Sequence, residues 1–156
     1  MTGKRDTIIA VASGTGGAIA LIRLSGPTAI AIGYRIFTSV SGSPLSRSKG
    51  FTVHFGHIRN EADEIIDYVL VSLFRAPRSY TGEDMLEISC HGSTFIQREI
   101  LRLCIREGAR MAQGGEFTLK AFLAGKMDLS QAEAVADIIA SDSRAALTLA
   151  TRQIRG

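Results

Sequence analysis

The sequence predicts an α+β fold, and three observations support this class. β-branched, apolar runs at residues 7–12 and 64–74 are typical of strands, whereas residues 93–106 carry apolar side chains at the spacing of an amphipathic helix. Strands and helices follow one another without regular β-α alternation, so we expect a mixed antiparallel sheet with helices. The length of 156 residues suits one domain, and no internal repeat is visible.

The first half of the chain combines strands, turns and one helix. The expected elements are a strand at 7–12, a glycine-rich turn at 13–17, a strand at 18–24 and a helix at 28–37 that follows Pro27. Residues 39–49 are rich in Ser and Gly, which predicts a loop and the segment most prone to disorder.

The second half begins with an expected hairpin and continues with helices. The expected elements are strands at 51–59 and 64–74 joined by an acidic turn, a connector at 76–82, a strand at 86–90, and helices at 93–106 and 116–123. Ser130 and Glu133 have the spacing of a capping box, which predicts a helix through Ile139. A last helix from Asp142 has a wide apolar face and no cap, so we expect a partner beyond this sequence, either a missing domain or another chain.

Composition indicates a soluble globular protein, with 46% hydrophobic and 21% charged residues. The net charge of +3 is too small to argue for nucleic-acid binding, which depends on clustered cations. Cys90 and Cys104 lie in apolar stretches without metal-ligand spacing and are expected to be reduced core thiols. No apolar run approaches the ~18 residues needed to span a membrane, so we expect a cytoplasmic protein without a membrane partner.

Two glycine motifs invite a nucleotide-binding interpretation and do not fulfil it. Gly14-Thr15-Gly16-Gly17-Ala18-Ile19 has Ile19 where a dinucleotide fingerprint needs its third glycine, and a strand follows instead of a helix. A tight turn is the favoured interpretation, and close approach of a ligand to the backbone is an alternative. Gly125-Lys126-Met127 lacks both the upstream glycine and the Ser or Thr of a P-loop.

Strand parity singles out two ionisable residues. Leu86, Ile88 and Cys90 share the predicted core face of their strand, so Glu87 lies on the other face together with Ser89 and His91. Arg23 follows Ile19 and Leu21 on one face of an earlier strand, which predicts a buried stem. Arg23 and Glu87 either pair with each other or hold a ligand that carries hydrogen-bonding groups.

The remaining candidates favour structural roles. His91 precedes the helix at 93–106, and a capping or structural role is favoured over acid-base chemistry. Arg98, Arg102 and Arg106 recur at four-residue steps, which is typical of a solvated basic face, with an RNA contact as the less favoured alternative. No Ser/His/Asp arrangement and no metal-ligand cluster is apparent, so we expect neither a catalytic residue nor a metal site in this chain.

Several motifs together resemble a known family. The longest are RSYTGED at 78–84 with EISCHG at 87–92, and GKMDLSQAEAVAD at 125–137. Shorter ones are DTI at 6–8, IRLSGP at 22–27, GEFT at 115–118 and AFL at 121–123. Over nearly the whole chain, this sequence resembles the N-terminal domain of the MnmE (TrmE) tRNA-modification GTPases.

The resemblance implies a tetrahydrofolate-binding-like, homodimerising domain over residues 1–120, followed at 121–156 by a linker and the first helices of a helical domain. It implies a 5-formyl-tetrahydrofolate-type cofactor. GTP, potassium and magnesium would belong to a GTPase domain absent from this chain. The family acts with the FAD-dependent MnmG (GidA) protein, and it installs an aminomethyl-type group on the wobble uridine of tRNA.

The family's folate contacts map onto Arg23, Glu87 and Lys126, each within a matching motif. One departure is that the family's loop often reads Pro-Pro-Gly-Arg before Gly-Gly, where this chain has Ser13-Gly14-Thr15; any contact from that arginine is lost. Two alternatives remain open: a purely structural dimerisation module with an internal Arg23–Glu87 salt bridge, and a free-standing folate-dependent one-carbon transferase.

Overall fold

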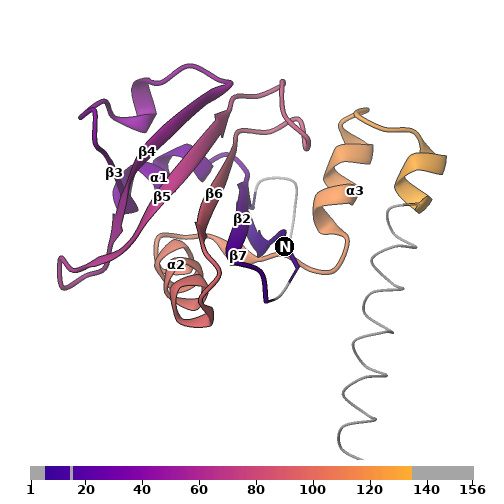
Figure 1. Ribbon diagram of the computed structural model, residues 1–156. Coiled ribbons are helices and arrows are strands. Elements are labelled where there is room, and N and C mark those ends of the chain that lie inside the picture. Colours follow the sequence, from indigo (N-terminus) through magenta and orange to yellow (C-terminus); the bar gives the residue numbers. More distant parts are fainter. Residues whose placement is uncertain (1–5, 15, 135–156) are drawn as a thin grey trace, which may run out of the picture.

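A seven-stranded sheet forms the centre of the fold (Figure 1). The computed structural model describes residues 6–14 and 16–134. The strands are β1 (Ile8–Val11), β2 (Ile19–Ser25), β3 (Phe37–Ser39), β4 (Thr52–Arg59), β5 (Ile65–Phe74), β6 (Met85–His91) and β7 (Arg110–Met111). Their order is β3-β4-β5-β6-β2-β1-β7. Neighbours are antiparallel except for the parallel β1–β7 pair, which confirms the α+β class and the mixed sheet.

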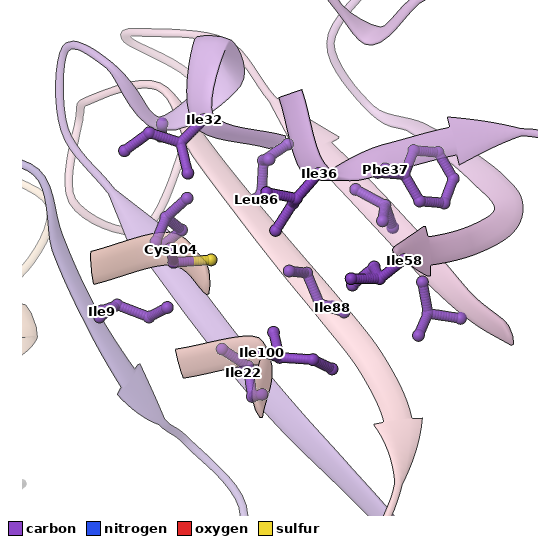
Figure 2. Close-up of a cluster of buried hydrophobic side chains, with 14 of the residues drawn as sticks. Ile9, Ile22, Ile32, Ile36, Phe37, Ile58, Leu86, Ile88, Ile100 and Cys104 are labelled. Atoms are coloured by element: carbon purple, nitrogen blue, oxygen red, sulfur yellow. The ribbon is translucent and has the colours of Figure 1, made fainter. Parts of the chain in front are cut away.

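The helices α1 (Ala29–Ile36) and α2 (Thr94–Arg106) pack on one face of this sheet and enclose the core. Figure 2 shows Ile36 of α1 and Ile100 of α2 in the same core cluster as Ile22 and Ile88 of the sheet. All four side chains are buried. Ser93 is the N-cap of α2, and its hydroxyl accepts a hydrogen bond from the Ile96 N–H at 3.4 Å. The helix α3 (Glu116–Leu123) lies beyond the β1–β7 edge, away from this core (Figure 1).

The other face of the sheet is mostly uncovered: among the described helices, only α3 reaches it, through Phe117 beside Arg23. Along β6 the residues Leu86, Ile88 and Cys90 are buried in the core, whereas Glu87 is half-buried and His91 is exposed. This alternation confirms the parity predicted from the sequence. Arg23 lies opposite Glu87 in the β2–β6 pairing. It therefore projects from the same uncovered face as Glu87, away from the core.

The segment at 39–49 is more ordered than its composition predicts. It begins at the last residue of strand β3 and contains a short 3-10 helix, η1 (Leu45–Arg47); neither element was expected. Leu45 is buried against the core, and the Arg75 guanidinium donates hydrogen bonds to the carbonyls of Ser48 and Ser46 at 2.8 and 3.0 Å. The prediction of disorder was wrong because one apolar residue and one distant arginine hold the serine-rich loop in place.

The helix after α3 begins earlier than the sequence predicted. Helical residues start at Leu129, and Asp128 is the capping residue. Its carboxylate accepts a hydrogen bond from the Gln131 N–H at 2.8 Å, while the Gln131 side chain accepts one from the Asp128 N–H at 2.9 Å. This reciprocal pair is the capping box, so its assignment to Ser130 and Glu133 was wrong. The rest of this helix and the expected helix from Asp142 lie outside the described residues.

Candidate functional site

Arg23 and Glu87 form an ion pair on the uncovered face of the sheet. They lie directly opposite each other on the antiparallel strands β2 and β6. Arg23 Nε and Nη2 donate hydrogen bonds to Glu87 Oε2 at 2.9 and 2.8 Å. The two side chains are 25% and 20% exposed, so both are partly desolvated. In the described part of the chain no hydrogen bond reaches Glu87 Oε1, which leaves one carboxylate oxygen able to accept from a ligand.

Two aromatic rings flank the guanidinium of Arg23. Its Cζ lies 5.3 Å from the centre of the Tyr80 ring and 5.7 Å from that of Phe117. Tyr80 belongs to the connector between β5 and β6, and Phe117 belongs to α3. The Tyr80 hydroxyl lies 3.2 Å from Thr118 Oγ1, which links the connector to α3. Cation–π contacts of this kind hold the guanidinium and leave its planar face able to stack on a ring.

A pocket of about 380 Å³ opens beside Arg23 and Tyr80. Its other walls are residues 10–12 at the end of β1 and the segment 112–118 that leads into α3. Gly115, the N-cap of α3, has φ 75°, a left-handed conformation that favours glycine. Glu116 pairs with Arg110 and not with Arg23, which is the only cation among the described residues that line the pocket. The side-chain hydrogen bonds of Arg110, at 2.6 and 2.9 Å, lower the pKa of Glu116 and keep it ionised.

Lys126 is not part of this pocket wall. It lies in the exposed turn after α3, beside Gly82. Within residues 6–14 and 16–134 no hydrogen bond or ion pair joins Lys126 to Arg23 or Glu87. The structure thus brings two of the three predicted site residues together, and the role of Lys126 stays a prediction.

A second polar cluster fastens α3 to the sheet. Lys120 Nζ of α3 donates to Glu83 Oε1 at 2.7 Å and to the Asp6 carbonyl at 3.0 Å. The same Glu83 oxygen accepts a hydrogen bond from the buried Ser25 hydroxyl at 3.0 Å, and Ser25 also contacts the buried Thr81 hydroxyl at 2.7 Å. These contacts position the helix that carries Phe117.

Asp67 is a buried partner of His91 that sequence analysis missed. Its carboxylate accepts a hydrogen bond from the His91 N–H at 2.9 Å, and its other oxygen lies 2.8 Å from His91 Nδ1. The Asp67 side chain is 8% exposed, whereas that of His91 is 70% exposed. This pair gives His91 the structural role that the sequence favoured, although the cap of α2 is Ser93.

The aromatic neighbours of Arg23 and the acidic partner of His91 had weak sequence signals. Tyr80 and Phe117 come from a connector and a helix, where strand parity says nothing about facing residues. Both occur inside the RSYTGED and GEFT motifs, and that was the available hint. Asp67 interrupts an otherwise apolar strand as Glu87 does, so the same parity argument could have found it.

The described residues contain neither a metal-ligand cluster nor a membrane-spanning helix. No group of three or more His, Cys, Asp or Glu side chains there is placed to hold a metal ion. No helix among them has the length and apolar character needed to cross a membrane.

The fold and the pocket define a small α+β domain with a half-buried charged pair flanked by aromatic rings. Comparison with known proteins gives its family. The profile of the family described as "GTP-binding protein TrmE N-terminus" matches residues 7–126, and the chain belongs to this family.

Curated relatives carry the name tRNA modification GTPase MnmE. The protein of Flavobacterium psychrophilum is 56% identical over 97% of this chain, and that of Bacteroides fragilis is 60% identical over 98%. The relative from Cytophaga hutchinsonii is 52% identical over 100% of the chain. In each case the match covers 33% of the relative, so the chain spans about a third of the length of the curated relatives it matches.

Proposed function

We propose that this chain is the folate-binding and homodimerisation domain of a tRNA-modification GTPase. The observation that carries the proposal is the Arg23–Glu87 pair. Its Arg23 contacts Tyr80 and Phe117 and lines a pocket of about 380 Å³, whereas Glu87 adjoins the pocket only through Arg23. Membership of the TrmE N-terminal family and the names of the relatives support the same function.

The residues present fit the ring system of a folate. Glu87 keeps one oxygen without a hydrogen bond in the described structure, and a carboxylate can accept from adjacent amino and ring N–H groups. Tyr80 and Phe117 offer flat apolar surface for a heteroaromatic ring. Arg23 holds the Glu87 carboxylate in position through two hydrogen bonds. When bound, 5-formyl-tetrahydrofolate or a related folate would supply the one-carbon unit of the modification. Lys126 is the proposed third contact, through the folate's anionic tail.

The activity of the whole protein is part of the proposal. By family resemblance, it would hydrolyse GTP in a domain that uses potassium and magnesium. It would act in the cytoplasm as a homodimer with the FAD-dependent MnmG protein, and it would modify the wobble uridine of tRNA. The names of the curated relatives support the GTPase and tRNA-modification parts.

Calorimetry with 5-formyl-tetrahydrofolate tests the site. Glu87→Ala is expected to weaken binding about tenfold or more, since hydrogen bonds to a charged group contribute ~1.5–3 kcal/mol. Glu99→Ala is a matched control because Glu99 lies on α2, on the opposite face of the sheet from Arg23, and pairs with Arg102; it should keep the affinity of the unmodified chain. Sedimentation velocity of the same samples tests homodimerisation.

The structural alternative makes a different prediction. The Arg23–Glu87 pair is already satisfied internally, as a purely structural dimerisation module requires. If that alternative holds, Glu87→Ala lowers the melting temperature and the unmodified chain shows no folate binding. Measurable folate binding that Glu87→Ala leaves unchanged would contradict the site assignment.

A further inference from the structure

The stretch from residue 7 to residue 60 contains no Asp or Glu. Its five cationic residues are Arg23, Arg35, Arg47, Lys49 and Arg59. Three of them are ion-paired, with Glu87, Glu107 and Asp63 respectively. Arg47 and Lys49 form no ion pair with any described residue, and both are exposed. The positive charge of this stretch is therefore available to a ligand only around η1.

Arg47 and Lys49 border a hollow of about 490 Å³ at the β3–β4 edge of the sheet. The hydroxyls of Ser41, Ser43 and Thr52 and the ring of His54 also line it. His54 Nε2 lies 2.9 Å from Thr52 Oγ1. No lining residue carries a carboxylate, so the hollow offers an anion only cations and hydrogen-bonding groups.

The backbone around this hollow is held in shape. Leu45 is buried in the core, and Arg75 donates hydrogen bonds to the carbonyls of Ser46 and Ser48. A loop that is already ordered loses less conformational entropy when it binds a ligand. The cationic side chains of Arg47 and Lys49 therefore start from a fixed backbone.

Phe51 exposes an aromatic ring two residues after Lys49 in the chain. This residue is 65% exposed. Its φ of 59° is left-handed, which is rare and unfavourable for a bulky residue. A hydrogen bond from the Phe51 N–H to the Leu73 carbonyl, at 2.8 Å, stabilises this backbone conformation. The Phe51 ring packs edge-to-face with the Phe74 ring, with 6.0 Å between the ring centres. One face of the Phe51 ring is thus left for a stacking partner.

We propose that this edge binds single-stranded RNA, with phosphates at Arg47 and Lys49 and a base stacked on Phe51. Basic side chains that follow the backbone, together with an exposed aromatic ring, are the combination by which single strands are held. The exposed Ser43 hydroxyl, which has no hydrogen bond to a described residue, can pair with a ribose 2′-hydroxyl group, which favours RNA over DNA. The inference rests on the proposed function only for the choice of RNA as the polyanion.

This surface is separate from the Arg23 pocket. The sheet order places β3 and β4 at one edge and β1 and β7 at the other. Figure 1 shows η1 and α3 on opposite sides of the sheet. A folate and an RNA strand could therefore occupy the chain together, and each site can be tested without disturbing the other.

Fluorescence anisotropy of the full chain with a labelled RNA hairpin that has a single-stranded loop tests the inference. Arg47→Glu, Lys49→Glu and Phe51→Asn are the test variants; Asn tolerates a left-handed backbone, so this change removes the ring without added strain. Arg98→Glu on α2 is the charge-matched control. Circular dichroism checks that all four variants fold.

Each test variant is expected to raise the dissociation constant for RNA about tenfold. Phe51→Asn removes one stacked base, and each charge reversal replaces a phosphate contact with repulsion. The charge variants should also flatten the salt dependence between about 50 and 200 mM, by roughly 0.7 in slope per lost phosphate. Arg98→Glu should change the constant by less than about twofold.

Unchanged RNA affinity in the three test variants overturns the inference. So does equal weakening by Arg98→Glu, which would indicate a general charge effect. Binding to phosphatidylserine vesicles without RNA binding would assign the edge to a membrane, and binding of inorganic phosphate alone would leave no RNA site. Folate affinity measured on the same variants should not change, so the outcome here is independent of the folate proposal.

Discussion

The two edges of the sheet treat their charged residues in opposite ways. At the edge that carries α3, Arg23, Arg110 and Lys120 each have a carboxylate partner. At the edge that carries β3 and η1, Arg47 and Lys49 have none among the described residues. The α3 edge is held together by charge, whereas the β3 edge is held by apolar packing and backbone hydrogen bonds.

The difference shows that the number of cations in a sequence does not locate its positive surface. The arginines of α2 recur regularly and look like a basic stripe, yet Arg102 and Arg106 both pair with Glu61 of the β4–β5 turn. The serine-rich segment around η1 has fewer cations but keeps them without acidic partners. The electrostatic field at a surface therefore depends on which carboxylates the fold places beside its cations.

The largest effect is expected at the β3 edge, where close backbone packing replaces ion pairs. A Cβ added at Gly56 of β4 would overlap the Thr38 carbonyl and the Phe37 ring of β3. Gly56→Ala should therefore destabilise the protein by about 3 kcal/mol, as overpacking at a rigid site does. Urea unfolding measures this. Gly114→Ala, where the added Cβ meets nothing within 4 Å, is the control, and equal loss in both variants would contradict the packing account.

A smaller loss is expected from the buried pair at the α3 edge. Lys120→Met leaves the Glu83 carboxylate, 23% exposed, without its cationic partner. We expect a loss of roughly 2 kcal/mol, below the figure for a fully buried pair because water still reaches Glu83. The double variant Lys120→Met/Glu83→Gln should recover part of it in a double-mutant cycle. Additive losses would show that the two residues do not interact.

Acid should weaken the α3 edge through Glu116. Arg110 lowers the pKa of Glu116 from its ordinary value of 4.5, so the stabilisation is complete above about pH 4.5 and is lost as the pH falls through the lower folded-state value. Glu116→Gln should cost roughly 1 kcal/mol at neutral pH, a discounted figure for a partly solvated pair. Melting curves of the two proteins should converge once the pH has fallen below the lowered folded-state pKa of Glu116. A difference that persists there would assign the effect to shape instead of charge.

The smallest effect is expected at the exposed Glu61 network. Hydrogen bonds from Arg102 are the main cause that lowers the pKa of Glu61, but the pairs are solvated. Glu61→Gln should shift the melting temperature by no more than about 2 °C, and added salt should remove even that shift. The same variant frees Arg102 and Arg106. RNA binding by Arg102 and Arg106 in this variant would show that pairing with Glu61 is what keeps these arginines from binding RNA in the unmodified chain.

Local pattern was enough to predict most of the fold. The apolar periodicity of 93–106 and 64–74 gave α2 and β5, and Ser93 was placed at the start of α2. The short β3 and β7 escaped because three and two residues carry no readable period. The capping box was misplaced because Ser130 and Asp128 both fit the pattern, and only the hydrogen bonds with Gln131 separate them.

The candidate site divides in the same way. Parity alone predicted which face of its own strand Arg23 and Glu87 each occupy, because side-chain direction alternates along a strand whatever the neighbouring strands are. Which strands become neighbours is decided by the tertiary fold. Only the β2–β6 pairing puts the two residues opposite each other, and only the docking of α3 adds Phe117.

The sequence by itself determined the fold class, the core faces of the strands and the resemblance to the TrmE N-terminal family, because these depend on residue type and local spacing. The tertiary structure decided which cations are neutralised, that Asp67 supports His91, and that a serine-rich loop is ordered by Leu45 and Arg75. These features depend on contacts between residues far apart in the chain, such as Arg75 with Ser46, and no local pattern encodes them.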